Sequence, residues 1–182
     1  MRDRASFGYI VAGSVFLIDQ LSKWLVTDIL GIRSLGDRME VVSFFDLRFV
    51  PNVGVSLGLL AADSDAMRWA LVALTGAIAV AVGVWMAREA NRHDRIALAL
   101  VLGGALGNIL DRIRFGYVVD FANLHFGEWR PFLVFNVADA GITIGVVILL
   151  LRAVFVRDKE SETGADSNKA GPGAAPVEKM NA

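Results

Sequence analysis

Cysteine is absent from the 182-residue chain, and histidine occurs only at His93 and His125. The missing cysteines exclude disulfides, thiolate nucleophiles and cysteine-ligated metal sites. Two histidines supply too few nitrogen ligands for zinc to be expected, so we predict no metal and no other cofactor. A strong charge imbalance is missing as well, because the formal net charge is -1. The sequence therefore gives no indication of a nucleic-acid partner.

Long apolar blocks dominate the chain instead. Hydrophobic residues make up 55% of it, and the mean hydropathy is +0.53, which is high for a soluble domain. The blocks cover residues 7–25, 69–87, 96–113 and 132–156, close to the ~20 residues that a helix needs to cross a bilayer. Lipid allows no unpaired backbone, so these blocks must be helices. We predict an α-helical integral membrane protein with four transmembrane helices.

The flanks of these blocks indicate the topology. Arg2 and Arg4 precede the first block, as in a signal peptide, but the run continues into DQLSKW instead of a small-residue cleavage site. We therefore expect the first span to be retained. Lysine and arginine are denser, and lie in shorter segments, on the side that carries both termini. This bias predicts that both termini are cytoplasmic.

The segments on the opposite side predict a small β-rich extracytoplasmic subdomain. One segment, about residues 38–60, is rich in valine and phenylalanine and is punctuated by Pro51, Asn52 and Gly54. That composition is typical of short strands rather than a further helix. A second outer segment, about residues 114–131, is also long enough to fold over the helices.

The domain organisation follows from the same composition. We predict one membrane domain over residues 1–158. Residues 159–182 are polar and rich in glycine, alanine and proline, so we expect a disordered cytoplasmic tail.

Ionisable residues inside the spans cost several kcal/mol (about 2.5 or more) unless they are paired or hydrated. In the first span, Asp19 and Lys23 are four residues apart and share a helix face. We interpret them as an ion pair near the outer interface, in which Lys23 reaches toward water and Asp19 stays close to it.

The third span carries a polar stripe formed by Gly104, Asn108, Asp111 and Arg112. Arg112 could bind a carboxylate or a loop carbonyl, and Asp111 could hold it in place. The glycines of this span are typical of close helix packing rather than of catalysis.

Asp120 and Asp139 are different, because neither has a basic residue three or four positions away. Asn136 lies three residues before Asp139 and shares its helix face. Both acids fall near the outer ends of spans, so we expect them to face each other. Two close carboxylates tend to share one proton. One can then activate water while the other, protonated, polarises a carbonyl, which is peptide hydrolysis without a metal.

Two other classes of function fit a pair of membrane acids. A small proton-coupled carrier or channel could use them as a relay, but the halves of the chain show no inverted repeat. A non-catalytic scaffold could use aspartate and asparagine to hold helices together.

The motifs of the chain favour hydrolysis. DQLSK begins at Asp19, PNVGVS contains Asn52, GGALGNILDR ends at Arg112, VVDF contains Asp120 and FNVAD ends at Asp139. In this order and setting they resemble the lipoprotein signal peptidases, also called signal peptidase II, which are membrane aspartyl proteases of bacteria. The resemblance covers residues 19–139 and includes the plan of four spans.

The resemblance implies a catalytic dyad of Asp120 and Asp139. It implies substrate-binding or supporting roles for Asp19, Lys23, Asn52, Gly54, Gly104, Asn108, Asp111, Arg112, Asn136 and Ala138. The implied substrate is a prolipoprotein that is cleaved just before a cysteine bearing a diacylglyceryl group. The implied location is the bacterial inner membrane, with the active site near the outer leaflet. We expect a monomer that contacts membrane lipid and binds no nucleic acid.

Overall fold

The structure is a computed structural model that describes residues 2–54 and 65–167. It contains four helices long and apolar enough to cross a membrane. They are α1 (Arg2–Trp24), α2 (Asp65–Arg88), α3 (Arg92–Phe115) and α4 (Val137–Ser167). The predicted class of fold is confirmed. The chain divides into two units, residues 1–149 and 150–182, and the site described below lies within the first.

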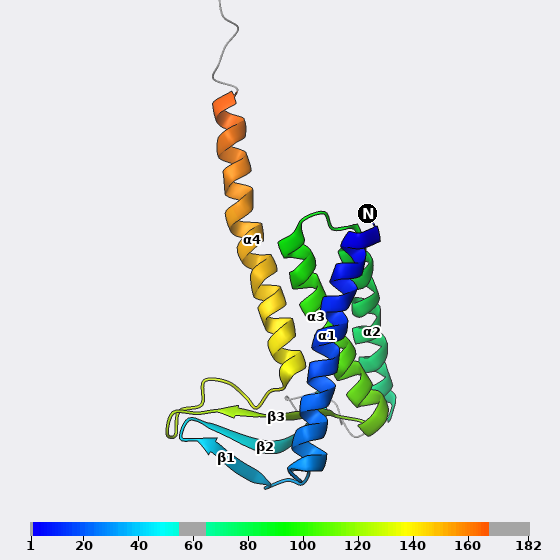
Figure 1. Cartoon of the computed structure of the whole chain (residues 1–182), viewed down its shortest axis with the longest axis vertical. Helices are drawn as coiled ribbons and strands as arrows, with labels where there is room; N and C mark the ends of the chain where they lie inside the picture. Colours follow the sequence, from blue (N-terminus) through cyan, green and yellow to red (C-terminus); the bar gives the residue numbers. More distant parts are fainter. Residues whose placement is uncertain (1, 55–64, 168–182) are drawn as a thin grey trace, which may run out of the picture. The chain divides into compact units, whose positions relative to one another are not determined.

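Helix α3 packs closely against α1 and α4 through its glycines (Figure 1). A Cβ atom at Gly103 would collide with the carbonyl oxygen of Ala12, and one at Gly104 with that of Ala138. A Cβ atom at Gly107 would lie 2.5 Å from the carboxylate of Asp19. Only glycine allows these approaches, so the prediction of close helix packing is confirmed.

Two helix ends differ from the predicted spans. The helix of the first span continues past Trp24 as a short π-helix, η1 (Leu25–Ile29). Helix α4 begins at Val137 instead of residue 132. The residue before the cap, Phe135, exchanges backbone hydrogen bonds with Ala122 of the outer sheet (2.8 and 3.0 Å). These bonds keep the chain extended as far as Asn136, the residue that caps α4. The apolar run of the sequence does not reveal this later start of the helix.

A three-stranded antiparallel sheet lies at one end of the helices (Figure 1). Its strands are β1 (Arg38–Val42), β2 (Phe45–Asn52) and β3 (Val118–Leu124), in that order. The strands predicted within residues 38–60 are therefore confirmed as far as Asn52, and residues 55–60 lie outside the described part. The third strand comes from the second outer segment. In the register of β2 and β3, Val50 lies opposite Asp120.

One side of the sheet is apolar and packs against the end of the bundle. Leu47 and Phe49 of β2 and Val119 and Phe121 of β3 form a buried cluster with Val26 of η1. This cluster fixes β3 against the first span. As a result, the polar residues of β2 and β3 are carried to the ends of α3 and α4.

The last helix extends past the predicted domain boundary. Helix α4 continues through Ser167, beyond the predicted end of the membrane domain at residue 158. The polar residues just after that position include good helix formers and no proline. The domain boundary and the disordered tail stay predictions. Residues 168–182 lie outside the described part of the chain.

Candidate active site

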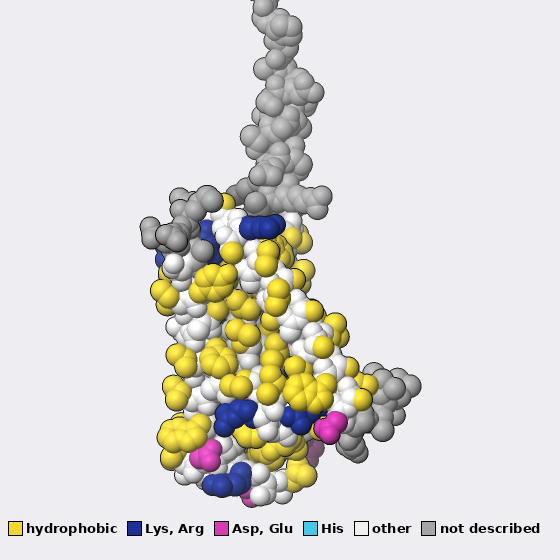
Figure 2. Space-filling view, turned by 90° about the vertical axis from the view of Figure 1, so that its right-hand side faces the viewer, with side chains coloured by type: hydrophobic (Ala, Val, Ile, Leu, Met, Phe, Trp, Pro, Cys, Tyr) yellow, Lys and Arg dark blue, Asp and Glu magenta, His cyan; other side chains and the backbone are white. Residues whose placement is uncertain are grey.

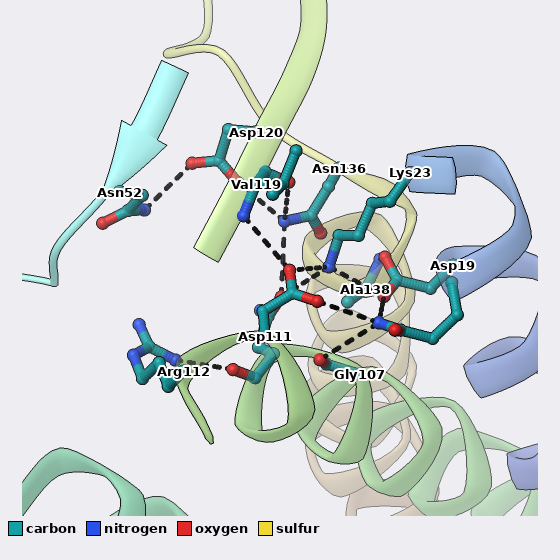
Figure 3. Close-up of polar contacts among 12 residues, drawn as sticks. Asp19, Lys23, Asn52, Gly107, Asp111, Arg112, Val119, Asp120, Asn136 and Ala138 are labelled. Carbon is teal, nitrogen blue, oxygen red and sulfur yellow. Dashed lines mark hydrogen bonds and ion pairs between the residues drawn. The ribbon is translucent and has the colours of Figure 1, made fainter. Parts of the chain in front are cut away.

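Asp120 and Asp139 are brought together by Asn136. Asp120 lies in β3, and Asp139 lies in the first turn of α4. The side-chain amide of Asn136 donates to Asp120 Oδ1 (2.6 Å), while its backbone N–H donates to Asp139 Oδ2 (3.3 Å). One residue therefore contacts both carboxylates, which come from different elements of the fold. Figure 3 shows the bond from Asn136 to Asp120.

The link to Asp139 is a reciprocal cap of α4. The backbone N–H of Asp139 donates to Asn136 Oδ1 (2.8 Å), while the Asp139 carboxylate accepts from the Asn136 N–H. This is the capping-box arrangement, which satisfies free N–H groups at a helix start. Asn136 and Asp139 are polar residues at the start of the last apolar block, and their role there is to form the N-terminal cap of α4. The cap also holds Asp139 in one orientation.

Two more asparagines bind one acid each. Asn108 Nδ2 of α3 donates to Asp139 Oδ1 (2.8 Å), and Asn52 Nδ2 of β2 donates to Asp120 Oδ2 (3.0 Å). Asn52 also accepts from the N–H of Gly54 (2.9 Å), where the backbone has a φ of 92°. A side chain is strained at such a φ. Gly54 thus forms the tight turn that positions Asn52.

The pKa of Asp120 is raised to about 7. Burial is the largest cause, and the negative charge of Asp139 adds to it. The hydrogen bonds from Asn52 and Asn136 oppose the shift, as does the positive charge of Lys23. Asp120 is therefore the member of the pair that favours holding a proton near neutral pH.

Lys23 lies in a buried ionic cluster behind the two acids. Its Nζ is 2.8 Å from Asp19 Oδ2 and 2.7 Å from Asp111 Oδ2. Lys23 is 5% exposed and Asp19 is 0% exposed. The prediction that Lys23 reaches toward water is wrong, because Lys23 turns to Asp111 and Asn108 of α3. The prediction that Asp111 holds Arg112 is also wrong: Asp111 turns to Lys23, since adjacent helical residues point in different directions.

The cluster fixes the backbone next to both acids. Asp19 Oδ1 accepts from the N–H of Ala138 (2.9 Å), and Asp111 Oδ2 accepts from the N–H of Val119 (3.1 Å). Ala138 precedes Asp139, and Val119 precedes Asp120. Lys23 also donates to Asn108 Oδ1 (3.3 Å). Each charged residue of this cluster is thereby connected to the position of a candidate catalytic group.

Sequence reasoning misses two residues of this region. Gln20 Nε2 bonds both Asp19 (3.1 Å) and Asp111 (3.0 Å), so it completes the cluster. The only signal for it is an amide in an apolar span beside Asp19. Arg68 at the start of α2 donates to the carbonyl of Arg112 (2.7 Å) and caps α3. No local pattern reveals this contact across helices.

Arg112 lies at the outer end of α3, where its Nη1 donates to the carbonyl of Asn108 (3.5 Å). A Cβ atom at Gly54 would lie 3.5 Å from Arg112 Nη2, so the guanidinium lies beside the turn that follows Asn52. It is half-buried and makes no ion pair with a described residue. Its positive charge is thus available next to the asparagines.

A cavity of about 310 Å³ opens beside Asp120. Its lining residues belong to the end of β2, the following turn and the segment before α4: Val50, Pro51, Asn52, Val53, Gly54, Asp120, Leu133 and Val134. Asp120 lines this cavity, whereas Asp139 is not among its described lining residues. Within residues 2–54 and 65–167, no group of three or more His, Asp or Glu side chains is arranged to hold a metal ion.

Replacing Lys23 should destabilise the fold. Lys23→Ala leaves Asp19 and Asp111 buried without their cation, and breaking a buried ionic cluster costs about 3–5 kcal/mol. We expect a clearly lower melting temperature in detergent. Arg130→Ala, at an exposed position, is the control and should melt like the original chain. An unchanged melting temperature for Lys23→Ala would contradict the role of the cluster.

Known proteins share this sequence and fold. A family model described as signal peptidase (SPase) II matches residues 11–155. The lipoprotein signal peptidase of Sphingopyxis alaskensis is 54% identical over 87% of this chain and 91% of its own length. That of Rhizorhabdus wittichii is 56% identical over 83% and 87%. A solved bacterial membrane enzyme is 28% identical with a TM-score of 0.71, covering 82% of this chain and 93% of its own.

The matched residues 11–155 include every residue of the site and most of the four spans. The relatives and the spans together point to a bacterial membrane. The chain belongs to the signal peptidase II family.

Proposed function

We propose that the chain is an aspartic endopeptidase in which Asp120 and Asp139 are the catalytic pair. The family is one of proteases whose function is to remove signal peptides from prolipoproteins. The observation that carries the assignment of the pair is the contact of Asn136 with both acids. It holds two carboxylates from β3 and α4 beside one another, which is the arrangement that acid–base hydrolysis requires.

In the proposed mechanism, ionised Asp139 takes a proton from a water molecule as the water oxygen attacks the scissile carbonyl carbon. Protonated Asp120 gives its proton to the carbonyl oxygen, and a tetrahedral diol forms. Asp139 then passes its proton to the departing nitrogen as the C–N bond breaks. Asp120 recovers a proton from the diol as the carbonyl re-forms. The raised pKa of Asp120 supports this division of roles.

Asn52, Asn108, Asn136 and Arg112 would bind the substrate and orient the two acids toward it. We propose that the substrate backbone lies extended along the cavity beside Asp120, with the signal peptide in the bilayer. Cleavage just before a diacylglyceryl cysteine fits this site, because the cavity lies where the sheet meets the ends of the spans. We further propose a monomer with both termini in the cytoplasm and its site near the outer leaflet.

The direct experiment uses the purified full chain in detergent with a prolipoprotein carrying diacylglyceryl cysteine. Released signal peptide, identified by mass spectrometry, is the expected product. The same prolipoprotein without the lipid group is the control and should be cleaved much more slowly. Intact lipidated substrate after incubation with folded protein would overturn the proposal.

The activity should fall on the alkaline side of neutrality. The mechanism needs a proton on Asp120, whose pKa is about 7, so kcat/KM should decrease as pH rises through that value. The hydrogen bond from Asn52 lowers this pKa, so Asn52→Ala should move the decline to higher pH. A profile that rises with pH above 7, or an unshifted decline in Asn52→Ala, would contradict the role of Asp120.

Cleavage should not depend on a divalent metal. The proposed chemistry uses two carboxylates and water alone, so activity in the presence of EDTA should equal that in its absence. The measurement is the initial cleavage rate before and after chelation. Loss of the rate with EDTA and its return with one divalent ion would indicate metal-assisted hydrolysis instead.

A further inference from the structure

A second cavity of about 290 Å³ lies between the ends of α1 and α3 and the apolar side of the sheet. Lys23 and Asp111 line it, so it adjoins the ionic cluster, but it shares no lining residue with the cavity beside Asp120. The proposed mechanism does not use this space. We propose that it binds the phosphate headgroup of an anionic phospholipid, with the acyl chains lying along the exposed ends of the helices.

Cationic side chains gather around this cavity. Arg33, Arg114 and Lys23 line it together with two acids, Asp28 and Asp111. Asp111 is already paired with Lys23. Arg33 and Arg114 therefore face Asp28 alone, and the lining carries a net charge of about +1, which favours an anion.

The two arginines are not engaged in ion pairs. Among residues 2–54 and 65–167, neither the Arg33 nor the Arg114 side chain has a carboxylate within salt-bridge distance. The hydroxyl of Tyr117, which also lines the cavity, has no hydrogen-bond partner in the same ranges. Guanidinium groups match phosphate oxygens with paired N–H donors. A phosphate would satisfy all three groups at once.

The cavity lies at the depth of lipid headgroups. Trp24 is the last residue of α1, which continues as η1, and Phe115 is the last residue of α3. The cavity is lined by both residues and by Thr27 and Asp28 of η1, so it lies near the ends of the first and third spans. The two rings are about half exposed, at 53% and 45%, and amphipathic aromatic residues prefer the membrane interface. Figure 2 shows a broad hydrophobic surface over the helices with lysine and arginine side chains at both of its ends, one group of them in the lower part of the view. A lipid could place its phosphate in the cavity and its chains on that surface.

The source of the phosphate is therefore a lipid rather than the solvent. Arg114 lies over the ring of Phe115, 4.8 Å from its centroid, so the cation and the apolar ring form one continuous surface. A free phosphate ion would use only the polar part of the cavity. A phospholipid would cover both parts, because its phosphate would contact the arginines and its acyl chains would contact the apolar ring.

The test uses Trp24 as a reporter within the cavity. In the full chain with Trp69, Trp85 and Trp129 changed to Phe, Trp24 is the remaining tryptophan. The protein is placed in nanodiscs that contain brominated phosphatidylglycerol or brominated phosphatidylcholine at equal fractions. Bromine near the ring quenches its fluorescence. Each arginine near an anionic lipid is worth about fivefold in affinity, so phosphatidylglycerol should be preferred roughly fivefold to 25-fold.

The variant Arg33→Gln/Arg114→Gln should bring this preference close to onefold without changing the melting temperature. Arg33→Lys/Arg114→Lys should keep part of it, since the charge remains without the paired donors. The control is Arg92→Gln/Arg130→Gln, which removes two cations outside the cavity; Arg92 also lies over an aromatic ring, that of Phe7. The control should keep the full preference.

Three results would overturn the proposal. Equal quenching by the two lipids in the original chain would mean that the cavity does not select an anionic lipid. An equal loss of preference in the control variant would mean that only the total charge matters. The third test adds inorganic phosphate and compares it with chloride at equal ionic strength. If phosphate relieves the quenching and chloride does not, the site binds a free anion instead of a lipid.

Discussion

Asp120→Asn and Asp139→Asn should each abolish cleavage of a lipidated prolipoprotein. An amide has nearly the same shape as the carboxyl group but cannot exchange the proton that the mechanism moves. General acid–base groups contribute about 10²- to 10⁴-fold each, so we expect a loss of roughly 10³-fold or more. The measurement is the initial rate of signal-peptide release, normalised to folded protein.

The same variants separate catalysis from stability. Asp120 is buried beside the charge of Asp139, so removal of one charge should leave the melting temperature unchanged or raise it. Asp65→Asn, where the side chain is 89% exposed, is the control and should retain full activity. Turnover near the original rate in either dyad variant would show that the catalytic pair is assigned wrongly.

Asn136→Ala should be the most damaging change outside the acids. It removes the donor to Asp120 (2.6 Å), the donor to Val119 O (3.2 Å) and the acceptor that caps Asp139 (2.8 Å). A hydrogen bond to a charged group is worth about 1.5–3 kcal/mol, and 1.36 kcal/mol corresponds to tenfold. We expect kcat/KM to fall about a hundredfold.

Two variants distinguish the loss of the cap from the loss of the contact with the acids. Asn91 caps α3 by accepting from His93 and Asp94, and it makes no described contact with either acid. Asn91→Ala should therefore lower stability by about 1 kcal/mol and leave the cleavage rate unchanged. Asn136→Ser keeps a capping oxygen but loses the amide donor, so it should lose activity while it melts at a higher temperature than Asn136→Ala. Equal activity of Asn136→Ser and the original chain would show that the bridge between the acids is unimportant.

The positions of the helices could be predicted from the sequence, because a segment that crosses a membrane must be apolar, helical and about 20 residues long. The strands in residues 38–52 could also be predicted, because β-branched and aromatic residues were bounded by turn residues. The closeness of Asn136 and Asp139 could also be predicted, because residues three apart lie on the same face of a helix. The catalytic assignment of Asp120 and Asp139 rested on their lack of local counter-ions and on the resemblance of the motifs, and it stays a prediction.

The sequence by itself determined which residues enter the membrane and which acids lack a partner nearby in the chain, since both properties depend on short stretches. Only the tertiary structure decided which groups meet. Lys23 pairs with Asp111 across two helices, 2.7 Å apart, because the glycines of α3 let α1 approach closely. The register of β2 on β3 carries Asn52 to Asp120. Backbone bonds from the sheet to Phe135 delay the start of α4 until Val137. Contacts between segments far apart in sequence depend on packing of the whole fold, and no local pattern encodes them.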